Sequence, residues 1–189
     1  MTNTAHADSL NARIAHEKSA ARMNENNVKK LEKTATFFAQ ATVADFLSTL
    51  NVDADFANKS ALTNERFDVY SIDSMCSILQ FALNAISIDS LKTNVAEVIQ
   101  TAIKLNDAEL SFTQDDAVIA LDKSVKIADK AKSAFYVRRK THFDSAKRHA
   151  QMTINAMLAL RALESTAKNT YKLADNELVT RLKERFAAL

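Results

Sequence analysis

The stretch that decides the fold covers residues 113–163 and reads TQDDAVIALDKSVKIADKAKSAFYVRRKTHFDSAKRHAQMTINAMLALRAL. It opens with Thr113, and Asp116 lies three residues later. This is the pattern in which a hydroxyl and a carboxylate bind the unpaired N–H groups of a first helical turn. No glycine or proline interrupts the remaining residues, so the stretch predicts one long helix, or two helices end to end.

Apolar residues in this stretch recur at alternating spacings of four and three, which places them on one helical seam. Cationic and imidazole side chains interrupt the same seam, and a shift of one residue after Arg139 restores it, as in a coiled-coil stutter. The apolar positions are Leu121, Val125, Ala128, Phe135, Ala146, Ala156, Leu160 and Leu163, and the interruptions are Lys132, Arg139, His142 and His149.

The composition of the whole chain supports an all-α fold. Its 189 residues include no glycine and no proline, where average usage would give roughly 13 and 9. Tight hairpin turns rely on glycine at positive φ, so a β-rich fold is not expected. Helices must then end on asparagine or another residue in place of glycine. We therefore predict an all-α, multi-helix bundle with a long C-terminal helix.

Residues 1–35 are predicted to form an N-terminal helical arm, and residues 36–189 the helical bundle domain. Three interpretations of the arm remain open: self-association through a coiled-coil seam, docking within the chain or on another protein, and a mobile tail. The seam has alternating spacings of four and three, with polar Glu17 and Asn24 among its positions. Its apolar positions are Leu10, Ile14, Ala21, Val28, Leu31, Ala35 and Phe38.

The bundle domain begins with an apolar segment, 36–50, and then breaks at 51–55, where Asx side chains are expected to bind local backbone. The strings Ser71–Ile72–Asp73–Ser74 and Ser87–Ile88–Asp89–Ser90 are identical, and each places a serine where it could cap a helix. The uncharged run 74–88 is predicted to be the most buried helix. It is too short and too polar to span a bilayer.

Charge is distributed unevenly along the chain, although the net charge is +2. Residues 51–122 hold four basic and twelve acidic side chains, whereas residues 123–189 hold fifteen basic and six acidic. Such an uneven charge distribution bears on how the protein associates with partners and does not indicate its fold.

The single cysteine, Cys76, excludes an intrachain disulfide and is interpreted as a small buried hydrophobic residue. We expect an intracellular (cytoplasmic) or virion protein, with no signal peptide and no membrane contact.

The sequence displays no catalytic signature. The P-loop, the dinucleotide fingerprint and the nucleophile elbow all require glycine. No His-Glu-x-x-His or Glu-x-x-His spacing occurs, and a single cysteine excludes a thiolate zinc cluster. His142 and His149 are two helical turns apart, about 10 Å, which is too far for one metal ion. We expect no enzyme activity, no catalytic residue, no cofactor and no metal site.

Basic residues interleave with aromatic ones between positions 135 and 149, a pattern found where proteins meet phosphates and stack on bases. On a helix the aromatic residues would instead face the core and the cations would form a solvated face. Acidic protein surfaces would suit these cations as well as nucleic acid does. The candidate partner-contact residues are Lys132, Arg138, Arg139, Lys140, Lys147 and Arg148.

Taken together, these features favour a non-enzymatic structural or interaction protein. We expect a homo-oligomer or a subunit of a larger assembly, such as a virus or phage particle, held by helical seams and complementary charge. The alternative is a small nucleic-acid-binding or regulatory helical module that uses the basic stretch 123–148.

Overall fold

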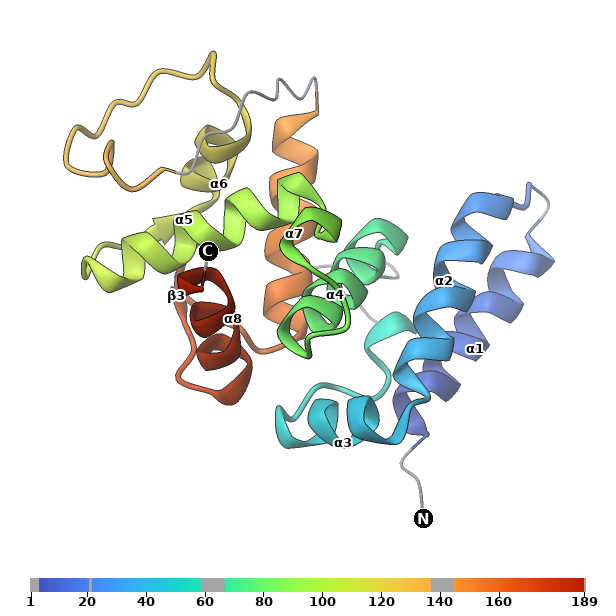
Figure 1. Cartoon of the computed structure of the whole chain (residues 1–189). Helices are drawn as coiled ribbons and strands as arrows, with labels where there is room; N and C mark the ends of the chain where they lie inside the picture. Colours follow the sequence, from blue (N-terminus) through green and yellow to red (C-terminus); the bar gives the residue numbers. More distant parts are fainter. Residues whose placement is uncertain (1–3, 21, 59–66, 137–144, 189) are drawn as a thin grey trace.

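The computed structural model describes residues 4–20, 22–58, 67–136 and 145–188. Across these ranges the chain is mostly helical, and it carries one small three-stranded antiparallel sheet (Figure 1). The helical character agrees with the prediction from sequence. The sheet corrects it, because the fold is not strictly all-α.

Two helices, rather than one, make up most of the predicted arm. Helix α1 spans Ala5–Ser19 and helix α2 spans Glu25–Phe38, and the two pack side by side (Figure 1). The side chain of Asn24 caps α2 by accepting hydrogen bonds from two backbone N–H groups, at 3.1 and 3.2 Å. The described apolar residues of the seam are buried in the main core of the chain, including Leu10, Ile14, Val28, Leu31 and Phe38, while Ala21 lies outside the described residues.

A buried arginine fastens α1 to the segments that lead into the rest of the chain. Arg13 is 6% exposed. Its Nη1 donates to the carbonyl oxygens of Ala57 at 2.8 Å and Phe67 at 2.9 Å, and its Nε donates to Glu17 at 2.7 Å. Helix α2 in turn packs on α4. The apolar side of the arm is therefore used within the chain, while the domain boundary after residue 35 stays a prediction.

The middle of the chain consists of short and long helices. Helix α3 spans Ala41–Thr49, a 3₁₀ turn η1 spans Phe56–Asn58, α4 spans Val69–Ala82, a second 3₁₀ turn η2 spans Ile88–Ser90, and α5 spans Thr93–Asp107. The predicted Asx turn is confirmed, since Asp53 accepts the N–H of Asp55 at 2.9 Å. The predicted serine caps are wrong: Asp68 caps α4, and Ser87 precedes only the 3₁₀ turn, without a capping bond.

Helix α4 is buried over most of its surface, which confirms the prediction for residues 74–82; the rest of the uncharged run, 83–88, lies beyond the end of this helix. Eleven of its fourteen residues are buried. They include Cys76, which is 2% exposed, and burial raises the pKa of that thiol to about 11 because a thiolate would lose its hydration. Cys76 is thus a core residue.

The prediction of one long helix, or of two helices end to end, over 113–163 is wrong, because residues 122–136 after α6 are not helical. Strand β1 spans Phe112–Thr113, α6 spans Gln114–Leu121, α7 spans Ala146–Ala159, and β2 begins at Leu163. Asp122 and Asp129 explain part of the break. Their carboxylates accept the N–H groups of Ser124 at 2.8 Å and Ala131 at 2.9 Å, and such local bonds compete with helical hydrogen bonding.

The sheet joins the two ends of this region. Strand β2 spans Leu163–Ala167 and β3 spans Thr170–Leu173, and the strand order is β1-β3-β2. Phe112 pairs with Tyr171, and Leu163 pairs with Leu173. Helix α8, Glu177–Ala187, comes next; the side chain of Asn176 caps it, and Leu178, Val179 and Leu182 are its buried residues.

Glycine is replaced at helix ends by residues that take its backbone conformation. In the described ranges five residues other than glycine have φ between 53° and 60°. Four of them stand just beyond the C-termini of α3, α4, α5 and α7, where each helix closes with the paired backbone bonds of a Schellman motif. These four are Asn51, Asn84, Glu109 and Arg161, and the fifth is Asn169 between β2 and β3.

Candidate functional site

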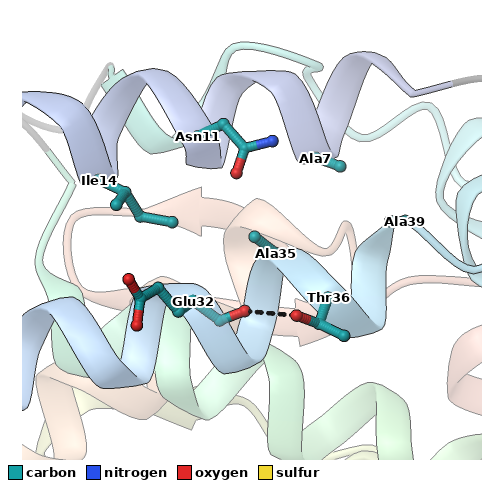
Figure 2. A pocket seen from close by; sticks show the side chains of 7 residues that line it. All are labelled: Ala7, Asn11, Ile14, Glu32, Ala35, Thr36 and Ala39. Atoms are coloured by element: carbon teal, nitrogen blue, oxygen red, sulfur yellow. Dashed lines mark hydrogen bonds between the residues drawn. The ribbon is translucent and has the colours of Figure 1, made fainter.

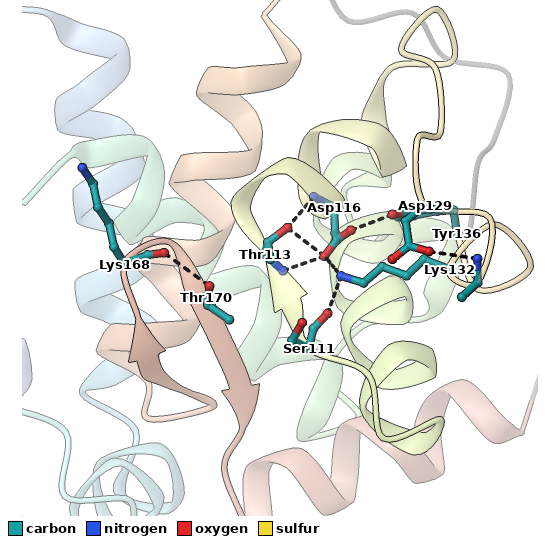
Figure 3. A network of polar contacts seen from close by, with 9 residues as sticks. Ser111, Thr113, Asp116, Asp129, Lys132, Tyr136, Lys168 and Thr170 are labelled. Atoms are coloured by element: carbon teal, nitrogen blue, oxygen red, sulfur yellow. Dashed lines mark hydrogen bonds and ion pairs between the residues drawn. The ribbon is translucent and has the colours of Figure 1, made fainter.

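Among the predicted contact residues that the structure describes, Lys132 alone lies inside the molecule. It is 8% exposed, and its Nζ lies 2.7 Å from Asp116 Oδ2 and 2.7 Å from the carbonyl oxygen of Ser111 (Figure 3). Tyr136 donates to the other oxygen of Asp116 at 2.6 Å. Lys132 and Tyr136 therefore hold the segment after α6 against the β1–α6 junction, and the ammonium group of Lys132 is occupied within the chain.

Asp116 is the centre of this network because it is also part of the helix cap. Its Oδ2 accepts the backbone N–H of Thr113 at 2.7 Å and the Thr113 hydroxyl at 2.8 Å, while the Asp116 N–H donates to that hydroxyl at 3.2 Å. The capping box predicted from Thr113 and Asp116 is thus confirmed. These hydrogen bonds surround the buried ion pair between Asp116 and Lys132, so the role of the network is structural.

Lys147 and Arg148 lie in the first turn of α7, and both are exposed. Arg138, Arg139 and Lys140 lie outside the described residues, as does His142. Two of the six predicted contact residues, Lys147 and Arg148, therefore lie together at the exposed start of α7. Lys132 lies apart from them, in the buried network around Asp116.

Helix α7 presents a polar stripe to the surface. Its apolar residues are buried where it packs on α4, α5 and α6. The residues one helical turn apart on the remaining side are Lys147, Gln151 and Asn155; the first is exposed and the other two are half-buried. Gln151 donates to Asn155 at 2.7 Å. Lysine, glutamine and asparagine are residue types that read base edges in a major groove, and here they follow one another over three turns of α7.

The β2–β3 hairpin lies directly after α7 and carries further cations. Lys168 stands in its turn, where Thr170 Oγ1 donates to the Lys168 carbonyl at 3.3 Å (Figure 3). Lys172 on β3 pairs with Glu164 across the hairpin at 2.8 Å. Between residues 145 and 174 the sequence holds five Lys/Arg side chains and one carboxylate. Helix α7 and the hairpin therefore form one cationic unit.

An aromatic ring that sequence reasoning missed lies beside the start of α7. Tyr70, in the first turn of α4, is 39% exposed. Lys30 Nζ of α2 lies 3.8 Å from its ring centroid, and Arg148 Cζ lies 5.6 Å from it. No local pattern in the sequence points to this contact, since the three residues are more than thirty positions apart.

His149 is affected by Arg148 and by a second cation, Lys92. Its pKa is lowered from the usual 6.5, first by burial and then by repulsion from Arg148 and Lys92. The imidazole is therefore held toward its neutral form by a positively charged neighbourhood.

One pocket lies away from these residues, between the two N-terminal helices. A pocket of about 270 Å³ between α1 and α2 is lined by Ala7, Asn11, Ile14, Glu32, Ala35, Thr36 and Ala39 (Figure 2). Its one carboxylate, Glu32, is paired with Lys18 at 2.7 Å, and its lining includes no second titratable group. Within the described ranges no three His, Cys, Asp or Glu side chains gather in a way that could hold a metal ion.

Two further findings bear on function. None of the helices described here combines the length and apolar character needed to cross a bilayer. No protein-family model matches the chain, and neither a curated protein nor a solved structure matches it significantly. A functional assignment therefore rests on the geometry and the charge of the chain itself.

Proposed function

We propose that this chain is a non-enzymatic protein that binds double-stranded DNA through α7 and the β2–β3 hairpin. The observation that carries the proposal is the placement of exposed Lys147 and Arg148 at the start of α7, the second helix of the pair α6–α7. In a helix-turn-helix protein the second helix enters the major groove, and its N-terminal residues contact the bases.

The order of elements supports this assignment. Helix α5, strand β1, helices α6 and α7, and then the hairpin β2–β3 succeed one another along the chain, and β1 pairs with β3. This is the element order of a winged helix, in which the hairpin is a wing beside the recognition helix. One departure is clear: α6 ends at Leu121 and α7 begins at Ala146, whereas a helix-turn-helix usually has a turn of three or four residues.

Electrostatics favour the same partner. The first turn of α7 adds its unpaired N–H groups and the positive end of its dipole to the charges of Lys147 and Arg148, and this combination attracts phosphate. Lys168 in the hairpin turn extends the positive surface. Duplex DNA is the better fit than duplex RNA, because the major groove of A-form RNA is too narrow for side chains to read.

The assembly subunit expected from sequence remains a prediction, as does the virion setting. Two of its motivations have changed. The apolar seam of the arm is buried within the chain, and the stretch 113–163 is broken after Leu121 instead of forming one long helix. The uneven charge remains, and it serves a DNA-binding surface equally well.

The test is binding of a fluorescently labelled duplex of about 20 base pairs, measured by anisotropy over a series of salt concentrations. Each phosphate that a cation of the protein neutralises contributes about 0.9 to the steepness of log affinity against log salt. Lys147 is proposed to neutralise one phosphate at the edge of the groove, so Lys147→Gln should make the dependence less steep by about that amount. Lys183→Gln, which removes the same charge from α8, should leave it unchanged. Absence of duplex binding at low salt, or equal weakening by both substitutions, would overturn the proposal.

A further inference from the structure

The surface around Tyr70 joins three helices that are far apart in sequence. Tyr70 lies on α4, Lys30 on α2 and Arg148 on α7, and α4 packs against both of the other helices. Few large hydrophobic side chains are exposed in the described ranges, and Tyr70, at 39%, is one of two. The tyrosine ring thus brings a cation of the N-terminal helices next to the first turn of α7.

Two further cations lie on the helices that meet near this ring. Lys33 follows Lys30 by three residues on α2, and Lys92 is the residue directly before α5. Lys92 and Arg148 both act on His149 of α7, so Lys92 lies near the start of that helix as well. We call the group Lys30, Lys33, Tyr70, Lys92 and Arg148 the Tyr70 surface.

Two carboxylates lie beside the Tyr70 surface, and each has a structural task. Asp68 caps α4 by accepting the N–H groups of Tyr70 and Ser71. Asp73 is paired with Lys92. Among the residues named here the surface holds four cations and two carboxylates, and the ion pair with Asp73 leaves Lys30, Lys33 and Arg148 as the cations that these two carboxylates do not pair.

We propose that the Tyr70 surface binds the phosphate backbone of the same DNA duplex whose major groove receives α7, and this inference rests on the proposed function. Arg148 belongs to both surfaces, so they are continuous. Tyr70 positions Lys30 and Arg148 through cation–π contact and leaves their N–H donors available to phosphate oxygens. Backbone contacts of this kind fix the register of a recognition helix without reading sequence.

The proposal extends the role of the N-terminal helices. α2 and α4 would act as a clamp on the strand beside α7, so that the protein contacts more phosphates than a helix and wing alone supply. Each added phosphate contact steepens the salt dependence of binding, which makes the contribution measurable one residue at a time.

The experiment uses the full chain and the labelled duplex described above. Lys30→Gln should lower the salt slope by about 0.9, and Lys30→Gln combined with Lys147→Gln by about 1.8. Lys18→Gln, on the neighbouring helix α1, serves as the matched control and should change nothing. Tyr70→Leu should weaken binding severalfold, whereas Tyr70→Phe, which keeps the ring, should bind as the wild type does.

The outcomes separate the two proposals. If Lys147→Gln lowers the slope and Lys30→Gln does not, the Tyr70 surface is overturned and the proposed function stands. If no duplex binds, both fall. If Lys30→Gln and Tyr70→Leu weaken binding while Lys147→Gln does not, the Tyr70 surface is supported and the assignment of α7 as the recognition helix is overturned. Tighter binding of an acidic polypeptide such as poly-glutamate than of duplex would overturn the nucleic-acid assignment of this surface.

Discussion

The buried ion pair between Lys132 and Asp116 should be essential for holding residues 122–136 against the β1–α6 junction. Lys132→Met keeps most of the side-chain volume and removes the charge that faces Asp116 Oδ2 at 2.7 Å. The two side chains are 10% and 5% exposed. Breaking such a buried pair from one side costs about 3 to 5 kcal/mol, because an uncompensated charge remains.

For Lys132→Met we expect a destabilisation at the lower end of this range. After the substitution Asp116 still accepts hydrogen bonds from Thr113 and Tyr136. We therefore expect a loss of about 3 kcal/mol in the free energy of unfolding, which corresponds to about 6 to 12 °C in Tm for a chain of this size. Asp116→Asn should cost a similar amount, since it leaves the Lys132 ammonium without its carboxylate.

The double substitution supplies the sharper test. Lys132→Met with Asp116→Asn leaves no buried charge at this site, so its cost should be smaller than the sum of the single costs by about 2 kcal/mol. Unfolding in urea at pH 7, monitored by circular dichroism, measures all three variants. Lys18→Met removes one partner of an exposed pair and should cost less than about 1 kcal/mol. If Lys132→Met proved no more costly than Lys18→Met, the packing of residues 122–136 would be refuted.

Three further outcomes are expected from the same structure. Glu109→Gly should raise the free energy of unfolding by about 0.5 to 1 kcal/mol in urea titrations, because glycine takes a φ of 57° without strain; a destabilised variant, or equal stabilisation by Glu109→Ala, would contradict this. Native Cys76 should react with iodoacetamide at pH 8 at least about 100-fold more slowly than the unfolded chain, since a pKa of about 11 leaves little thiolate; comparable rates would show that the thiol is accessible. His149 has a pKa lowered by burial and by Arg148 and Lys92, so the unfolded chain binds its proton more readily, and stability should fall as the pH drops below 6.5. His149→Asn should show a weaker fall in urea midpoints between pH 7 and pH 5, and an unchanged profile would speak against this.

The sequence predicted those features that depend on local chemistry. The Thr113–Asp116 capping box and the buried α4 both depend on residues within a few turns of each other. The replacement of glycine by asparagine at helix ends was also expected, and Asn51 and Asn84 confirm it.

Predictions from the sequence were wrong where tertiary packing overrides helical periodicity. A seam at helical spacing over 113–163 does not exclude a break, because Asp122 and Asp129 bind their own backbone and Lys132 turns inward to Asp116. The hairpin was missed because the absence of glycine was taken to exclude tight turns. Asn169, at a φ of 56°, makes the turn instead.

A partial local signal for the hairpin was present. After the asparagine turn, the apolar Tyr171 and Leu173 alternate with the polar Thr170 and Lys172 on β3. Strand β2 shows no such alternation, because it is exposed after Leu163. The contact of Tyr70 with Lys30 and Arg148 left no such signal, because helices distant in sequence create it.

The most direct measurement of the central claim is hydrogen–deuterium exchange of the full chain with and without saturating duplex DNA. Amides at the start of α7 and in the hairpin β2–β3 should exchange more slowly in the complex, together with those at the start of α4. Bound duplex that protects other helices and leaves α7 and the hairpin unchanged would contradict the account.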